Sequence, residues 1–233
     1  MRHHIYPINQ ILITATLLLC CSAGYASAPT VQVGGDFRQM SVATCTLKAV
    51  EAMAIKQNFI HAEINGPEAW GYNENSFVMV HAIPINDGVQ IFVVAFSTDN
   101  TEAERLRNEI REHVFNGPYN QRISQGYTTS DANRRQTPLR IHWGNFNKGV
   151  SQKTFRLCAQ SAMSHNGLRA SVGSDRVVYG TSNTVTVVAI GLQLPSTTQV
   201  LVITASMDSN EAERLRNEVR SQIVGCTPFD ESQ

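Results

Sequence analysis

The hydrophobic and polar positions of this chain form two patterns that repeat in the same order in its two halves. After Ser41 in the first half and Ser151 in the second, apolar residues recur at the spacing of a helix buried on one face. Either serine can cap such a helix, because its hydroxyl accepts a hydrogen bond from a free N–H of the first turn. Each half therefore begins with a predicted amphipathic helix.

Strand patterns follow each of these helices. In the first half they predict a short strand at 59–64, a second one with Trp70 and Tyr72, and a third from about 77 to 85. Asn86-Asp87-Gly88 then predicts a hairpin turn into an apolar fourth strand, VQIFVVAFS. The second half repeats this order and ends in TQVLVITAS. Fourth strands this apolar are typical of a central strand or of one covered on both faces.

The sequence EAERLRNE occurs at 102–109 and again at 211–218, where it opens the last helix of each half. Thr101 with Glu104, and Asn210 with Glu213, have the spacing of a capping box. The alanine and leucine of the octapeptide continue an apolar helix face, and its charges occupy the rest of the surface. The octapeptide therefore indicates a duplicated structural element rather than an active motif.

The duplication predicts the organisation of the whole chain. We expect one repeat at 31–117 and another at 140–226, joined by a polar linker at 118–139 and followed by a tail at 227–233. The order helix, four strands, helix predicts an α+β fold, with an antiparallel four-stranded sheet and two helices on one face of it in each repeat. The apolar fourth strands suggest that the two sheets join edge to edge by strand pairing.

Residues 1–26 have the three parts of a secretory signal peptide: Arg2, an apolar run at 11–21, and small residues after it. Cleavage after Ala26 avoids a proline directly behind the cut, whereas cleavage after Ala28 does not. We expect a periplasmic or secreted protein rather than one lipid-anchored through Cys20 or Cys21, because no small residue precedes the first of these cysteines. No later apolar run reaches membrane-spanning length, so the mature form is expected not to span a membrane.

Charge and cysteine content narrow the function classes further. The chain has 19 basic and 19 acidic residues and no basic cluster, which argues against nucleic-acid binding. Cys45, Cys158 and Cys226 remain after the signal peptide, and thiols pair in an oxidising compartment. We expect Cys45 to be an apolar core residue. Cys158 and Cys226 are a candidate disulfide if the two helices of the second repeat share one face, although spacing alone does not fix the pairing.

No motif for catalysis, a cofactor or a metal ion occurs in the chain: the GxSxG, P-loop, Rossmann, HExxH and CxxC patterns are all missing. His81 aligns with Ile190 of the second repeat, which favours a half-buried strand histidine over a catalytic one. We therefore predict no catalytic, cofactor or metal residues. The candidate binding surface consists of Trp70 and Tyr72, to which the pair His142 and Trp143 is added.

Asn58-Phe59, the hairpin around Asn86-Asp87-Gly88 and the capped helix at 101–114 resemble small bacterial envelope proteins and lipoproteins of unknown function. Their tandem use is similar to the helix-grip domains of outer-membrane assembly lipoproteins. The resemblance covers both repeats at the level of pattern and implies no catalytic residue. The chain departs from the lipoproteins because it lacks a good lipidation motif.

These observations predict an exported, non-enzymatic envelope protein that binds or assembles with another envelope protein or a small ligand. One alternative is a periplasmic hydrolase with a site between the repeats near Trp70, His142 and Trp143, which requires a deep polar pocket with a partnered histidine. Another is a carrier of a small apolar ligand between helices and sheet, which requires an enclosed cavity.

Overall fold

The computed structural model describes residues 28–57, 59–118 and 139–227. The predicted signal peptide, nearly all of the predicted linker and residues 228–233 of the tail lie outside the described residues. Within the described part of the chain, no helix is both long and apolar enough to cross a membrane.

Two units with the same order of elements make up the structure. The first comprises β1 (Thr30–Arg38), α1 (Val42–Glu51) with a π-helical turn η1 (Ala52–Lys56), β2 (His61–Asn65), β3 (Glu68–Tyr72), β4 (Ser76–Ile85), β5 (Gly88–Ser97) and α2 (Asn100–Asn116). The second comprises β6 (Arg140–Lys148), α3 (Gln152–His165), β7 (Arg169–Ser174), β8 (Val177–Thr181), β9 (Val185–Gln193), β10 (Thr198–Ser206) and α4 (Ser209–Gly225).

Each unit has one antiparallel sheet, with the order β1-β5-β4-β3-β2 in the first and β6-β10-β9-β8-β7 in the second. This confirms the predicted α+β fold with two tandem units, but each sheet has five strands rather than four. The strand missing from the prediction is the one before the first helix, β1 or β6. Gly34-Gly35 weakens its strand pattern, because glycine has no side chain to pack. As predicted, β5 is central: it lies between β1 and β4, and nearly all of it is buried.

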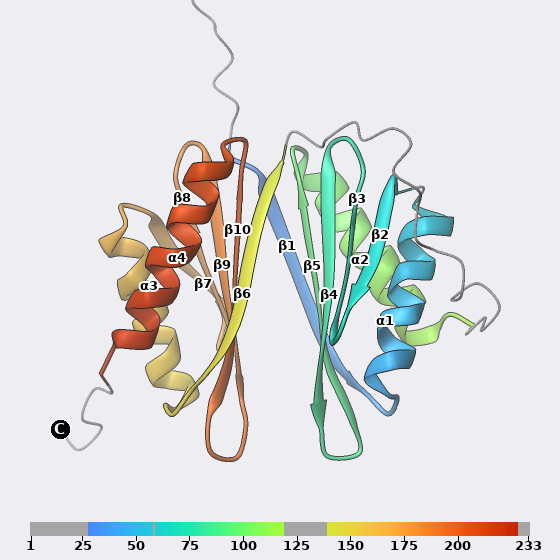
Figure 1. Cartoon of the computed structure of the whole chain (residues 1–233), viewed down its shortest axis with the longest axis horizontal. Helices are drawn as coiled ribbons and strands as arrows, with labels where there is room; N and C mark the ends of the chain where they lie inside the picture. Colours follow the sequence, from blue (N-terminus) through green and yellow to red (C-terminus); the bar gives the residue numbers. More distant parts are fainter. Residues whose placement is uncertain (1–27, 58, 119–138, 228–233) are drawn as a thin grey trace, which may run out of the picture.

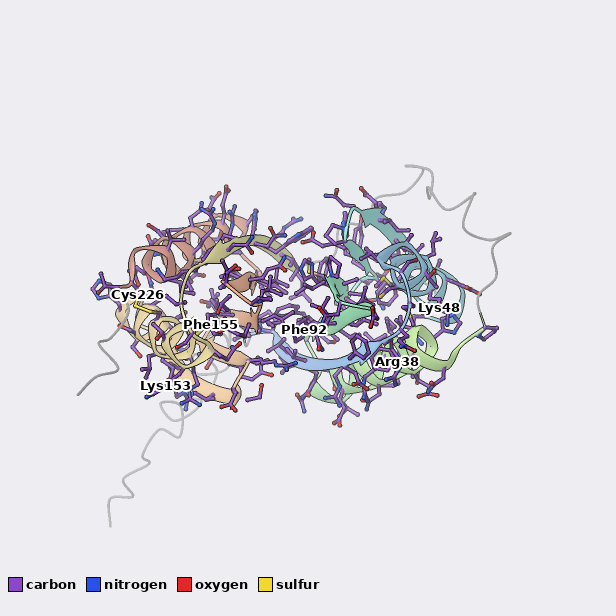
Figure 2. The ribbon with its side chains drawn as sticks, turned by 90° about the horizontal axis from the view of Figure 1, so that it is seen from below. Arg38, Lys48, Phe92, Lys153, Phe155 and Cys226 are labelled. Carbon is purple, nitrogen blue, oxygen red and sulfur yellow. A yellow bond between two sulfur atoms is a disulfide. The ribbon has the colours of Figure 1, made fainter. Side chains whose placement is uncertain are left out.

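The two sheets pack face to face, not edge to edge as the sequence suggested. The helices lie on the outer faces of the molecule and the sheets between them (Figure 1). Large apolar side chains of both sheets, among them Phe77, Phe92, Ile190 and Ile203, form one buried cluster between the sheets. Edge pairing would have left this second apolar face of each sheet in water. Figure 2 shows Phe92 in the middle of the molecule and Phe155, a buried residue of α3, within the second unit.

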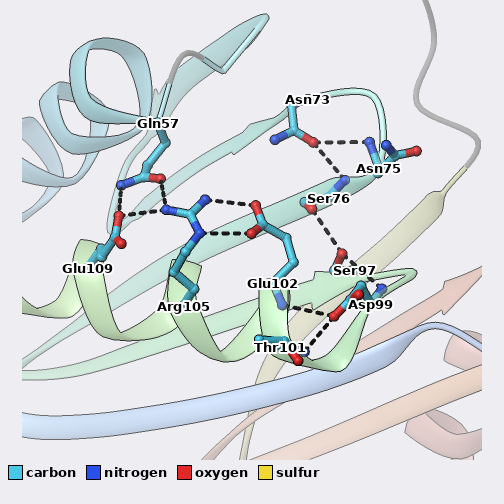
Figure 3. Close-up of polar contacts among 10 residues, drawn as sticks. All are labelled: Gln57, Asn73, Asn75, Ser76, Ser97, Asp99, Thr101, Glu102, Arg105 and Glu109. Atoms are coloured by element: carbon cyan, nitrogen blue, oxygen red, sulfur yellow. Dashed lines mark hydrogen bonds and ion pairs between the residues drawn. The ribbon is translucent and has the colours of Figure 1, made fainter.

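The helix starts agree only in part with the sequence prediction. Ser41 and Ser151 cap their helices as predicted, since their hydroxyls accept hydrogen bonds from backbone N–H groups three residues later. The last helices are capped two residues before the predicted Thr101 and Asn210. Asp99 Oδ1 accepts from the N–H of Thr101 at 2.7 Å (Figure 3), and Asp208 does the same in α4. An aspartate also suits the positive end of the helix dipole.

The octapeptide lies where the pattern placed it, on an amphipathic helix in each unit. Its alanine and leucine are buried in both copies. Arg105 bridges Glu102 and Glu109 on the exposed face of α2 (Figure 3). The next arginine, Arg107, lays its aliphatic stem on β1, where a Cβ at Gly34 would lie only 3.2 Å from Arg107 Cδ. The glycine therefore allows the helix to pack closely on the edge strand.

A one-residue difference between the units lies in the first helix. In the second unit the N–H of Leu168 bonds to the carbonyl of Met163 five residues earlier, at 3.0 Å. In the first unit Phe59 bonds to Met53 six residues earlier, also at 3.0 Å. The π-helical turn η1 occupies this interval and takes up the extra residue without displacing the strands that follow.

In each unit a contact at the same place links the two helices, but it is a disulfide in one unit and a hydrogen bond in the other. In the second unit Cys158 on α3 and Cys226 at the end of α4 form a disulfide with a Cα–Cα distance of 5.9 Å. In the first unit Lys48 Nζ on α1 donates to the carbonyl of Gly117, the C-cap of α2, at 2.7 Å. Lys48 and Cys226 lie at opposite ends of the molecule in Figure 2.

Candidate functional site

The four residues of the predicted binding surface lie together at one edge of the contact between the two sheets. Trp70 and Tyr72 come from β3 of the first unit, and His142 and Trp143 from β6 of the second. They line an open groove of about 260 Å³ together with further side chains, namely Phe77, Leu139, Arg140, Ile141 and Ser209. The sequence indicated the aromatic residues, but not that the two units build one groove from them.

Three aromatic rings form the walls of this aromatic groove. The ring centroids of Trp70 and Trp143 are 5.6 Å apart at an interplanar angle of 57°. Phe77 lies 5.9 Å from Trp143 at 41° and 6.2 Å from Trp70 at 21°. Both the two tilted pairs and the offset-stacked pair of Trp70 and Phe77 are favourable arrangements, because each avoids placing two negative ring faces directly on one another. The rings therefore form a corner with flat apolar walls rather than a flat platform.

Strand alternation explains how the rings reach the groove. Trp70 and Tyr72 are two residues apart on β3 and therefore point to the same face of the sheet. Gly71 between them faces the helices, where a Cβ would lie 2.6 Å from the carbonyl oxygen of His61 and 2.9 Å from the Phe59 ring. Ile141 and Trp143 alternate in the same way on β6, so that both face the first unit.

Behind Trp143 lies a polar cluster that joins the two units and is buried on the side of the first unit. Trp143 Nε1 donates a hydrogen bond of 2.8 Å to Glu68 Oε2, and Asn145 Nδ2 donates one of 3.2 Å to Glu68 Oε1. His81 Nδ1 lies 3.3 Å from the same Oε1. Glu68 is 5% exposed and His81 is fully buried. We call these four residues the Glu68 cluster.

The Glu68 carboxyl is ionised in spite of its burial. Burial by itself would raise the pKa of this carboxyl, but the adjacent His81 imidazole and the hydrogen bonds from Trp143 and Asn145 outweigh it. The pKa of Glu68 is therefore lower than usual. The cluster thus holds a negative charge between the sheets, with two neutral donors from the second unit directed at it.

His81 differs from its prediction as a half-buried strand histidine. It points between the sheets and has no exposed surface, because the second sheet covers that face of β4. Its neighbour Glu68 pairs with it in the strand register, and the equivalent register pair in the second unit is Val177 with Ile190. The alignment with Ile190 therefore located a buried position correctly, but it contained no sign of the acidic partner.

His142 and Ser209 form a contact that resembles part of a catalytic dyad, with 3.1 Å between Nε2 and Oγ. The equivalent positions in the first unit are Gln32 and Asn100, and Gln32 Nε2 donates to Asn100 Oδ1 at 3.0 Å. Both contacts tie the first strand of a unit to the start of its last helix. The groove is also open and largely aromatic, and therefore does not provide the deep polar pocket that the hydrolase hypothesis required.

Two further expectations from the sequence were that no residues bind a metal ion and, as an alternative function, that a ligand is carried in an enclosed cavity. Among the residues that the structure describes, no group of three or more His, Cys, Asp or Glu side chains is placed to hold a metal ion. The space between helices and sheet is filled by buried apolar side chains in both units. A carrier with its ligand in that space is therefore ruled out by packing. Cys45 is one of these buried side chains.

Internal symmetry provides a second position at which the same groove could have formed. The strand registers match Trp70 with Tyr179, Tyr72 with Thr181 and Phe77 with Thr186. They also match Trp143 with Val33. The second position therefore keeps one aromatic ring of four, so the aromatic groove is particular to one side of the molecule.

No protein-family model matches the chain. No curated protein matches it either. Similar solved structures are the di-domain ARO/CYC BexL from the BE-7585A biosynthetic pathway, with 7% identity, a TM-score of 0.25, and coverage of 84% of this chain and 93% of that one. The di-domain ARO/CYC StfQ from the steffimycin biosynthetic pathway has 7% identity and a TM-score of 0.26, over 84% and 97% of the two chains. DynU16, from the dynemicin biosynthetic locus, has 6% identity and a TM-score of 0.24, over 84% and 98%.

These matches contradict the function expected from the sequence, because the three similar structures belong to biosynthetic pathways and not to the bacterial envelope. The expectation of an envelope binding or assembly protein is therefore withdrawn. TM-scores this low carry no argument for giving the chain the activity of those proteins. The resemblance to small envelope domains stays a prediction, since none of the matches tests it.

Proposed function

We propose that this protein binds a small molecule by taking a planar ring into the aromatic groove between its two units. The observation that carries the proposal is the one-sided placement of the rings of Trp70, Phe77 and Trp143, which come from both units and are mostly replaced at the symmetric position. A structural need for packing would apply equally to both sides. The aromatic side therefore points to a ligand.

The size and rim of the groove limit the ligand. A volume of about 260 Å³ is below the range of drug-sized pockets and suits one ring or two fused rings. Each favourable ring pair contributes about 0.5–1.5 kcal/mol beyond the area it buries. Arg140, His142 and Ser209 also line the groove and supply a cation and hydrogen-bonding groups. We therefore expect an aromatic ring that carries a carboxylate or hydroxyl at one edge.

The experiment is a ligand screen by NMR with single-ring and fused-ring aromatic acids and phenols. Binding is expected to shift the indole N–H signals, which come from the two tryptophans of the chain. Replacing Trp70 with alanine removes one wall of the corner and is expected to weaken binding about tenfold or more.

The matched control is Tyr179→Ala, which removes the ring at the symmetric position and is expected to leave the affinity unchanged. Equal losses in the two variants would show that the ligand does not bind in the aromatic groove. No shift of either indole signal with any compound of these classes would contradict the proposed ligand.

A further inference from the structure

The indole N–H of Trp143 is hydrogen-bonded to a residue that does not itself line the groove. The indole of Trp143 forms one wall, and its N–H is directed away from the groove into the contact between the units. There it meets Glu68 Oε2 at 2.8 Å. Because Glu68 belongs to β3, two residues before Trp70, the strand that carries one wall of the groove also holds the opposite wall in place.

The carboxylate is itself held on several sides. Its Oε1 accepts from Asn145 at 3.2 Å and lies 3.3 Å from His81 Nδ1. A buried charge is costly unless it is paired and hydrogen-bonded. The contacts of Glu68 meet this condition, so that the carboxylate is a fixed acceptor for the indole.

The fold does not require this arrangement. The second unit has Val177 and Ile190 in place of Glu68 and His81, and the first strand of the first unit has Val33 in place of Trp143. Two sheets of the same topology therefore pack on one another with apolar residues at the symmetric position. Replacing both partners of a buried polar contact with apolar residues of similar shape is often neutral or stabilising, so stability alone does not account for the Glu68 cluster.

We propose that Glu68 is a positioning residue for the aromatic groove: by accepting the hydrogen bond from Trp143, it sets the ring orientation that receives the ligand. This inference rests on the proposed function. Without the acceptor, the N–H of the half-buried indole would lose its partner in the contact between the units, and the ring would turn to reach another one. The groove would then lose the angle between Trp143 and Trp70 that admits a flat group.

The main variant is the double substitution Glu68→Val with His81→Ile, which installs the residues of the second unit. The conservative variant is Glu68→Gln, whose amide oxygen still accepts from the indole. A Trp70→Phe variant keeps only one indole N–H signal, and that signal is thereby assigned to Trp143. A control is Gln90→Leu, which breaks another polar contact between the units, the 3.3 Å hydrogen bond from Arg176 Nη1 to Gln90 Oε1; neither residue lines the groove.

In the double variant we expect the Trp143 indole N–H signal to shift and to exchange with solvent about tenfold faster or more. Its midpoint of thermal unfolding is expected to stay within about 5 °C of the parent protein. Affinity for the aromatic ligand is expected to fall about tenfold. Glu68→Gln is expected to keep both the signal and the affinity close to the parent values, and Gln90→Leu is expected to change neither.

An unchanged Trp143 signal in the double variant would overturn the inference, whether or not binding changes. If no ligand binds the parent protein, the proposed function fails, whereas the indole signal still tests the positioning role. Should the double variant not fold, Glu68→Asp takes its place. It keeps the charge but withdraws the carboxylate by one methylene group, and a Trp143 signal that did not respond to it would also contradict the inference.

Discussion

Cys45 lies on the buried face of α1, packed among the apolar side chains of the first unit. Burial raises the pKa of its thiol from 9.0 to about 12, although the nearby charge of Lys48 acts in the opposite direction. Almost no thiolate is therefore present in the folded protein near neutral pH, and the thiolate is the reactive form.

We expect iodoacetamide at about pH 8 to leave Cys45 unmodified in the folded protein and to modify it after denaturation, as read by mass spectrometry of its peptide. The raised pKa also makes stability pH-dependent. The contribution of this thiol to stability is fully present below the ordinary pKa of 9.0. It declines as pH rises toward about 12, because the unfolded chain loses the thiol proton first. In urea unfolding at a series of pH values, Cys45→Ala is expected to remove this decline of the free energy of unfolding. The same decline in the variant would show that the Cys45 thiol does not cause it.

The sequence could predict single residues where strand alternation or helical spacing was enough. Trp70 and Tyr72 share a strand face because they are two positions apart, and Cys45 lies on the apolar face of a helix. The partners of Glu68 follow no such rule. Trp143 reaches it from 75 positions away and from the other unit, so the Glu68 cluster depends on how the sheets dock.

At the scale of elements, each helix pair is linked at an equivalent position. The second unit has the disulfide between Cys158 and Cys226, and the first has the hydrogen bond from Lys48 to Gly117. They are expected to differ in energy. A covalent link across 68 positions restricts the unfolded chain and contributes about 4 kcal/mol in the loop-entropy estimate. A hydrogen bond from a charged donor contributes about 1.5–3 kcal/mol.

We therefore expect replacement of both cysteines by alanine to lower the free energy of unfolding of the second unit by about 4 kcal/mol. Lys48→Met should lower that of the first unit by about 1.5–3 kcal/mol. Hydrogen exchange resolved by unit separates the two effects. A cysteine variant as stable as the parent in non-reducing buffer would show that the link contributes little.

Element starts and ends were less predictable than element types. Both Thr101 and Asp99 are good helix caps, and the chain uses Asp99, whose carboxylate accepts from two backbone N–H groups. The π-helical turn η1 left no sign in the sequence, because a one-residue insertion can be taken up in a helix, a turn or a strand bulge. The structure locates it by the backbone hydrogen bond from Gln57 N–H to the Ala52 carbonyl, five residues earlier, at 3.2 Å.

At the scale of the whole molecule, the apolar fourth strands suggested either a central position or coverage on both faces, but not what would cover them. The helices account for one face. The suggestion that the sheets join edge to edge through these strands was wrong, because a wholly apolar strand reads the same whether its second face packs on a helix or on another sheet. The contact between the sheets is large and apolar, and this predicts that neither unit is stable as a separate monomer.

Residues 139–227, expressed alone, would expose the apolar face that holds Val188, Ile190, Leu201 and Ile203. We expect this fragment to form a dimer or larger assembly through that face in analytical ultracentrifugation, since exposed patches of this kind drive association. Placing lysine at Leu201 and Ile203 should shift the fragment toward monomer, because charges at the centre of such a contact are costly to bury. A monomeric fragment with the thermal stability of the full chain would contradict this, and would mean that the two units dock without depending on one another.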